Sequence, residues 1–160
     1  MTLLRPMPHK PADATAFTIR AARPEDVEQV IELDEATTGM RKASYWDDML
    51  GTSEIPANQQ FFLVAMADGE LLGFIVGEAH AWEFGSPPCG WIFAIGVDPR
   101  TRLEGIGTAL FEAVCERFRR AGMTRIRTML ARDAQLLMSF FRSQGMMAGP
   151  FIELEKALDE

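Results

Sequence analysis

Residues 97–114 read VDPRTRLEGIGTALFEAV, and this stretch decides the fold. It leads from the end of an apolar strand, through a proline and two arginines, into two glycines and an amphipathic helix. Ile106, Leu110 and Val114 recur every four residues, which places them on one face of that helix. Because the first N–H groups of a helix lack helical partners and its dipole favours negative charge there, the junction predicts an anion site.

Arg102, Gly105 and Gly107 strengthen this prediction. Glycine lets the backbone approach phosphate oxygens, and an arginine adds charge-assisted hydrogen bonds. The sequence contains no GxxxxGK[ST] loop, and Leu110 occupies the third glycine position of a dinucleotide fingerprint. The alternative is a plain strand-to-helix turn, with glycines for tight packing and arginines as solvated charge.

Composition restricts the class of protein. The 160 residues, 48% hydrophobic and 24% charged, predict one globular domain at residues 16–160 behind a flexible tail at residues 1–15. No apolar run is long enough to span a bilayer. A net charge of −7 argues against nucleic acid and anionic membranes as partners. Two cysteines are too few for a disulfide framework or a zinc site, which predicts a cytoplasmic protein without a metal.

Hydrophobic periodicity predicts the order of elements. The alternating run at residues 17–21 indicates a strand, and residues 27–33 and 45–50 indicate two helices. Two β-rich runs joined by Asp68-Gly69 indicate a hairpin. Residues 91–97 predict a further antiparallel strand, 105–121 a helix, 125–130 a strand, 134–144 a helix, and 150–158 a last strand through Phe151, Ile152 and Leu154.

The pattern Val97-x-Pro99-x-x-Arg102-x-x-Gly105-x-Gly107 resembles the acyl-CoA loop of the GNAT superfamily of N-acetyltransferases, R/Q-x-x-G-x-G/A preceded by V-x-P. The likeness continues along the chain. TIRAARPEDVEQVIEL (18–33) resembles the family's opening strand and helix, VAMADGELLGFIVG (64–77) its hairpin, and MSFFRSQGM (138–146) its late FYEKLGF element. The resemblance therefore covers residues 17–154 in order.

This resemblance implies an α+β fold: a mixed, mostly antiparallel sheet of six to seven strands flanked by about four helices. The strands at residues 91–97 and 125–130 should splay apart, and the pantetheine arm of CoA should fit between them like an added strand. Gly96 is expected to accommodate a bulge there.

The resemblance also implies acetyl-CoA as co-substrate and a set of residues that contact it. Arg100, Arg132 or Arg142 are possible ligands of the ribose phosphate, the alternative being solvated surface arginines. The implied cofactor-binding residues are Ile95, Gly96 and Val97 along the strand, Arg102, Leu103, Glu104, Gly105, Ile106, Gly107 and Thr108 around the pyrophosphate, and Phe141 near the sulfur.

The implied reaction is direct attack of a primary amine, of a small molecule or a protein, on acetyl-CoA in a ternary complex. An alkyl ammonium has a pKa near 10.4, so a base must remove its proton. The strand at residues 91–97 contains no carboxylate or histidine. Glu78 is the preferred catalytic base and Glu83 the second, with His80 nearby; each has an equal alternative as an ordinary rim residue.

Phe141 stands where the family's FYEKLGF element places a tyrosine that protonates the leaving thiolate. A CoA thiol with a pKa near 8.5 can leave without it. The departure nevertheless suggests a second reading, a catalytically weak acyl-CoA-binding sensor or interaction module.

Carboxylates and aromatic side chains between residues 32 and 50 and between residues 78 and 90 would suit a cationic amine acceptor. The alternative is a solvated acidic helix face. Family members often form homodimers, and nothing in the sequence fixes such an interface.

Overall fold

The computed structural model describes residues 16–51 and 60–159. The predicted tail at residues 1–15 and most of the predicted loop at residues 51–60 therefore lie outside the described residues. The chain divides into two compact units, Met1–Met129 and Leu130–Glu160. Within the described ranges, no helix has the length and apolar character needed to cross a membrane.

The first unit is built on a sheet whose five strands follow the chain order β1-β2-β3-β4-β5. The β1–β2, β2–β3 and β3–β4 pairs are antiparallel, and the β4–β5 pair is parallel. The prediction of a mixed, mostly antiparallel sheet is confirmed. The strands are β1 (Thr18–Ala21), β2 (Gln60–Ala67), β3 (Glu70–His80), β4 (Cys89–Val97) and β5 (Ile126–Thr128).

Four α-helices occur in the described residues, as expected. Short 3-10 segments precede α1, follow β3 and precede α3; they are η1 (Pro24–Asp26), η2 (Glu83–Gly85) and η3 (Pro99–Glu104). The first unit contains α1 (Val27–Thr38), α2 (Ala43–Gly51) and α3 (Ile106–Arg120), and the second contains α4 (Gln135–Ser143).

The predicted number of strands is wrong for the described residues, where five are present instead of six to seven. The strand expected through Phe151, Ile152 and Leu154 does not form, and these three side chains are largely exposed. Alternation of apolar and charged residues is compatible with a strand, but a strand also needs a neighbouring backbone to pair with. The sequence pattern predicted the first condition and could not test the second.

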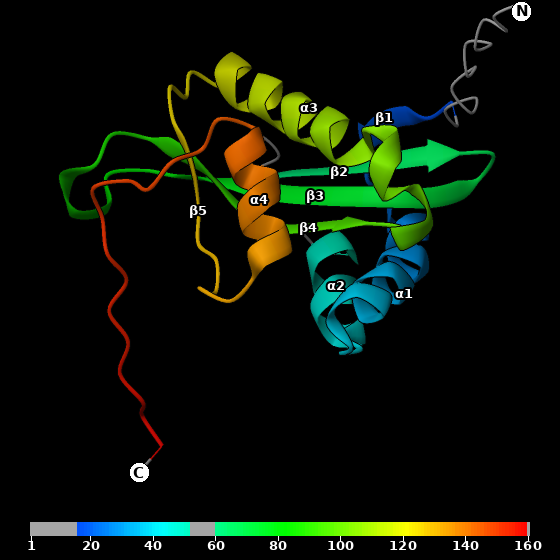
Figure 1. Ribbon diagram of the computed structural model, residues 1–160, viewed down its shortest axis with the longest axis horizontal. Coiled ribbons are helices and arrows are strands. Elements are labelled where there is room, and N and C mark those ends of the chain that lie inside the picture. Colours follow the sequence, from blue (N-terminus) through cyan, green and yellow to red (C-terminus); the bar gives the residue numbers. More distant parts are fainter. Residues whose placement is uncertain (1–15, 52–59, 160) are drawn as a thin grey trace, which may run out of the picture. The chain divides into compact units, whose positions relative to one another are not determined.

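The sheet of the first unit is covered on both faces (Figure 1). Because side chains alternate along a strand, Phe74 and Val76 of β3 pack with α1 and α2 in one apolar cluster that also contains Trp46 and Phe62. The rings of Trp46 and Phe74 meet edge to face with centroids 5.2 Å apart. Burial of each such large side chain contributes about 1.5–3 kcal/mol.

Helix α3 packs on the opposite face, where glycines let it come close. A Cβ at Gly77 or Gly90 would lie 2.8 Å or 2.7 Å from the ring of Phe118, closer than real Cβ contacts. The fully buried Phe118 ring therefore occupies the space that side chains at these positions would need. This contact fixes α3, and hence its N-terminus, against the strands that carry the site.

The β2–β3 hairpin turns at Asp68 and Gly69, as predicted. Both residues have positive φ, +50° and +75°, the combination that matches the twist of a two-residue hairpin. The turn places Glu70, the first residue of β3, at the sheet end from which α3 begins.

Candidate active site

The second half of β4 has an open edge. β5 pairs with β4 only along residues 90–92, whereas β3 pairs with β4 as far as Val97. Thr128, the last residue of β5, donates its hydroxyl hydrogen to the carbonyl of Ile92 over 2.7 Å. In the part of the chain that the structure describes, no strand pairs with the β5 side of residues 93–97. The predicted separation of the two strands is confirmed, and such an edge can accept an extended ligand.

A β-bulge lies where β5 leaves β4. Val76 pairs with Ala94, and the next residue of β3, Gly77, pairs with Ile92. Phe93 is therefore the extra residue, and its side chain is 39% exposed. Because a bulge bends its strand and increases the local twist, it turns the open half of β4 away from the closed half.

The bulge predicted at Gly96 is wrong. Gly96 lies directly opposite Phe74 in the ladder, and a Cβ at this position would lie 2.6 Å from Cε1 of Phe74. The glycine is needed because a buried ring crosses it, and sequence alone does not show which ring does so. Its neighbours Ile95 and Val97 are half-buried and flank the open edge as predicted.

The open edge leads into the head of α3. Gly105 has φ +78°, a left-handed conformation that favours glycine, and the space beside its Cα is empty within 4 Å of an added Cβ. The first bond of the helix runs from the N–H of Ala109 to the carbonyl of Gly105, 3.0 Å. No side chain caps this end. The first turn, which includes Gly107 and Thr108, thus presents a positive dipole end to an anion.

The two arginines of the loop have different surroundings. Arg102 is exposed and makes no ion pair with any described residue. The Nη2 atom of Arg100 lies 2.7 Å from Oδ2 of Asp98 and 2.6 Å from Oε1 of Glu70. Arg100 therefore binds two carboxylates of its own chain while its side chain stays 73% exposed, which agrees with the predicted alternative of a solvated surface arginine. A contact between Arg100 and the ribose phosphate stays a prediction.

The remaining loop residues contribute through the backbone or lie outside the description. Ile106 is fully buried, so its side chain belongs to the core and only its backbone is available to a ligand. Nothing is described of the side chains of Leu103 and Glu104.

The structure brings Glu78 and Glu83 together through His80. Nε2 of His80 is 2.8 Å from Oε1 of Glu78, a hydrogen bond, and Nδ1 is 2.8 Å from Oε1 of Glu83. The second contact lacks hydrogen-bond geometry, since Nδ1 is buried without a hydrogen-bond partner among the described residues. We therefore treat Glu78–His80 as a bonded pair and Glu83 as a nearby charge.

This acidic cluster lies beside the closed half of β4. Glu78 pairs across the strands with Trp91, whose ring centroid is 5.5 Å from that of His80. Ile92, at which β5 leaves, is the next residue of β4. The carboxylate is thus one strand away from the beginning of the open edge. Among the described residues, no group of His, Cys, Asp and Glu side chains could hold a metal ion.

Tyr45 on α2 faces the same region. Burial raises the pKa of its phenol, and the charges of Glu78 and Asp34 raise it further, so the hydroxyl stays protonated at neutral pH. Asp34 itself accepts a hydrogen bond from the indole N–H of Trp46 at 2.9 Å and pairs with Lys42 at 3.0 Å.

The turn after β3 carries two exposed aromatic residues in strained conformations. Trp82 and Phe84 have φ values of +63° and +46°, which bulky side chains rarely adopt. They flank Glu83 and are 67% and fully exposed. Strain of this kind persists where the surroundings enforce it and is frequent at functional sites.

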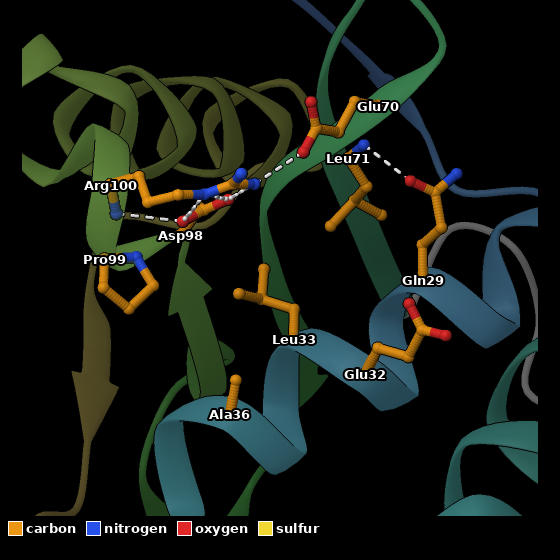
Figure 2. A pocket seen from close by; sticks show the side chains of 9 residues that line it. All are labelled: Gln29, Glu32, Leu33, Ala36, Glu70, Leu71, Asp98, Pro99 and Arg100. Atoms are coloured by element: carbon orange, nitrogen blue, oxygen red, sulfur yellow. Dashed lines mark hydrogen bonds and ion pairs between the residues drawn. The ribbon is translucent and has the colours of Figure 1, made fainter.

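A pocket of about 270 Å³ lies between α1 and the beginning of η3 (Figure 2). Its wall includes Asp98, Pro99 and Arg100; of the residues predicted to contact the cofactor or to act in catalysis, it contains Arg100 alone. It is on the β3 side of β4, away from the open edge. We therefore place the candidate site at the edge and helix head, and not in this pocket.

Phe141 belongs to α4 in the second unit, where its ring lies 5.2 Å from that of Phe140. Its contact with a cofactor stays a prediction, as do those of Arg132 and Arg142.

Sequence reasoning missed several residues of the site. Thr128 and Phe93 mark the opening, but they are defined only by strand pairing. Asp98 could have been found, because an aspartate before a proline at a helix start is a typical cap. Its side chain accepts a hydrogen bond from the N–H of Arg100 at 2.9 Å.

Comparisons with known proteins agree with this geometry. The chain is 27% identical to a mycothiol acetyltransferase of Paenarthrobacter aurescens over 107 residues, which are 67% of this chain and 30% of that protein. The chain thus spans about a third of the length of this relative. Its fold matches an aminoglycoside 6'-N-acetyltransferase of Acinetobacter baumannii with a TM-score of 0.76 at 16% identity, covering 89% of this chain and 99% of the other.

A second aminoglycoside N-acetyltransferase, solved in complex with CoA, matches with a TM-score of 0.74 at 17% identity, covering 89% of this chain and 95% of the other. The sequence profile of the Acetyltransferase (GNAT) family matches residues 27–146. Since this match covers most of the chain, the chain belongs to the GNAT family of acetyltransferases.

Proposed function

We propose that this protein is an N-acetyltransferase that uses acetyl-CoA and transfers the acetyl group to a primary amine of a small molecule or a protein. The observation that carries the proposal is the open edge of β4 ending at an uncapped helix head. A ligand with an extended amide-bearing arm and a diphosphate fits both features in that order. A plain strand-to-helix turn would not need the open edge.

The backbone of Ile95 to Val97 would hold the pantetheine arm, and the segment from Arg102 to Thr108 would hold the diphosphate. Gly105 leaves room for phosphate oxygens beside the backbone, and the exposed guanidinium of Arg102 adds charge. When bound, acetyl-CoA supplies a thioester that is reactive toward amines. The protein's contribution is to orient it and to exclude competing geometries.

Glu78 is the proposed base for the acceptor ammonium. It lies one strand from the beginning of the open edge, and its hydrogen bond to His80 fixes the orientation of the carboxylate. Glu83, 2.8 Å from the other ring nitrogen of His80, adds a second negative charge beside this pair. A direct transfer in a ternary complex needs no covalent acyl-enzyme.

The acceptor proposed here is an amine, with a cationic molecule favoured by the same geometry. Glu78 and Glu83 supply negative charge, and the exposed rings of Tyr45, Trp82 and Phe84 supply faces for cation–π contacts. An ammonium group held between them would sit where its proton can be removed.

Two measurements test the proposal. Acetyl-CoA should raise the melting temperature, and an amine screen with thiol detection should release CoA with some acceptors. Glu78→Gln should lower kcat about 10²- to 10⁴-fold, because a neutral amide cannot accept the proton of the acceptor ammonium. The exposed Glu112→Gln on α3 is the matched control. No melting shift with any acyl-CoA would contradict the proposal.

A second function remains tied to Phe141, the residue at the family's tyrosine position. A sensor that binds acyl-CoA but turns over slowly would show the melting shift without thiol release. Phe141→Tyr separates the two: a large gain in turnover favours a degenerate catalyst, and unchanged turnover in an active protein shows that no acid is needed there.

A further inference from the structure

Arg100 is held in a clamp that joins the beginning of the diphosphate loop to the β2–β3 hairpin. Its Nε atom lies 3.1 Å from Oδ1 of Asp98, and its Nη2 atom reaches both Oδ2 of Asp98 and Oε1 of Glu70 (Figure 2). Glu70 is thirty positions earlier in the chain. The contact is therefore tertiary, and it connects two segments that the loop sequence alone does not relate.

Asp98 is the centre of this clamp. Its backbone N–H donates to the carbonyl of Leu72 at 2.8 Å, and its own carbonyl accepts from the N–H of Thr101 at 2.9 Å. Its side chain is 11% exposed, and its carboxylate accepts hydrogen bonds from both the backbone and the guanidinium of Arg100. These hydrogen bonds hold the pKa of Asp98 below its usual value. All of its polar groups thus fix the first turn of η3.

The other side of the hairpin is tied to α1. The side chain of Gln29 accepts a hydrogen bond from the N–H of Leu71 at 2.8 Å and donates to the carbonyl of Gly69 at 3.3 Å. Glu70 lies between these two residues, so its backbone is held in place while its carboxylate binds Arg100. The clamp therefore connects the loop to a rigid part of the sheet.

We infer that Arg100 is a positioning residue for coenzyme A, which acts through Asp98 and Glu70 to hold the diphosphate loop and does not itself contact the 3'-phosphate of the ribose. This inference rests on the proposed function. In a 3-10 helix, residues two positions apart differ by about 240° around the axis, so Arg100 and Arg102 lie on different sides of η3. One arginine anchors the loop and the other is left for the ligand.

The physical reason is preorganisation. η3 is a six-residue 3-10 segment, longer than is usual for this geometry, and it ends at a left-handed glycine. A loop ordered before binding pays less conformational entropy when the ligand arrives. Releasing the clamp should therefore weaken CoA binding while leaving the chemical step, which takes place at the other end of the arm, unchanged.

The test compares CoA with 3'-dephospho-CoA by calorimetry on purified variants. Arg100→Gln should raise the Kd of both ligands by the same factor, about tenfold, and raise the KM for acetyl-CoA with kcat unchanged. Glu70→Gln, on an exposed side chain that does not threaten folding, should raise both Kd values about two- to threefold, because surface ion pairs are weak. Arg100→Lys should recover part of the loss, since lysine keeps the charge but not the fork.

Arg120→Gln is the matched control, an exposed arginine paired with Glu116 at the far end of α3. It should change neither Kd. A loss confined to CoA, with 3'-dephospho-CoA unaffected by Arg100→Gln, would show a direct phosphate contact and overturn the inference. Unchanged affinities in both Arg100→Gln and Glu70→Gln would overturn it as well. If the unmodified protein bound neither ligand, the proposed function would fail, and the inference with it.

Discussion

The two halves of β4 differ in the number of strands that pair with them. Residues 89–92 pair with β3, and residues 90–92 also pair with β5, whereas residues 94–97 pair with β3 alone and Phe93 is the bulged residue between the two halves. Both halves are apolar and both contain a glycine crossed by an aromatic ring, Gly90 by Phe118 and Gly96 by Phe74. The two halves thus share an apolar character and a buried glycine, and they differ in whether a second strand pairs with them.

This difference teaches that the candidate site depends on the end of β5: β5 stops pairing with β4 after Ile92, and the remaining residues of β4 keep an unpaired edge among the described strands. In the closed half, the backbone forms hydrogen bonds with strands on both sides, and this half is part of the core. In the open half, no described strand pairs with the β5 side of β4, and the chain continues through η3 to the beginning of α3. This unpaired edge is the proposed place for the pantetheine arm. Variants in the closed half should thus change the free energy of unfolding, and variants beyond the open half should change ligand affinity.

The largest expected effect is on the closed half. Phe118→Ala removes the ring that packs against Gly77 and Gly90 and should lower the free energy of unfolding by about 3–5 kcal/mol. Urea denaturation measures this. Gly90→Ala should cost about 1–3 kcal/mol in the unmodified protein and less in a Phe118→Leu background. Equal costs in both backgrounds would show that the ring is not what excludes a side chain.

The next largest effect is expected on CoA binding at the beginning of α3. A glycine at the other end of the same helix provides the control. Gly105 and Gly122 stand at the two ends of α3 with φ of +78° and +85° and open space around each. Alanine at either position should cost about 1 kcal/mol of stability. Gly105→Asp should also weaken CoA binding tenfold or more, because a carboxylate would face the diphosphate. Calorimetry that found the same loss for Gly122→Asp would contradict this assignment.

Low pH should destabilise the protein through Asp98, the residue that follows the open half of β4. The hydrogen bonds from Arg100 hold the pKa of Asp98 below its usual value of 3.8 in the folded protein. Between the folded and the unfolded pKa of Asp98, the unfolded chain therefore binds more protons than the folded one. The stabilisation is complete above the unfolded pKa and is lost as the pH falls through the folded value. Melting temperatures measured from about pH 5 to pH 2 should fall less steeply in Asp98→Asn. An unchanged slope would exclude this carboxylate as an acid-sensitive group.

The smallest effect concerns the point where the halves meet. Thr128→Val deletes the 2.7 Å hydrogen bond to the carbonyl of Ile92 and should cost about 0.5–1.5 kcal/mol. Hydrogen exchange should then quicken at the β4–β5 pairs along residues 90–92 and not in the β2–β3 ladder. Faster exchange across the whole sheet would mean that the hydroxyl does not mark the boundary.

Much of this architecture could be predicted from local pattern. The hairpin at Asp68 and Gly69 follows from residues that tolerate positive φ, and α3 follows from its four-residue apolar repeat. The misses share a cause. The segment through Ile152 has the alternating pattern of a strand, but no strand forms there. The bulge was predicted at Gly96 because glycine is common at bulges. Both outcomes depend on which backbone lies alongside.

The candidate site divides in the same way. The glycine loop and Arg102 could be identified because they occupy a continuous stretch. The sequence named Glu78, His80 and Glu83 as candidates. Glu78 and His80 share a face of β3 because they are two residues apart, but only the turn after β3 brings Glu83 to them. For Arg100 the sequence offered a phosphate contact or a solvated surface position, and the pairing with Glu70 could be read only from the fold.

By itself, the sequence determined the order of the elements in residues 17–144, the turn at the hairpin and the glycine-headed helix that follows β4. These depend on φ preferences and on periodicity, which act over a few residues. Tertiary structure alone decided where β5 leaves β4, which ring crosses Gly96 and which carboxylates hold Arg100. Those are pairings between segments up to tens of residues apart, and their energies exist only once the sheet has formed.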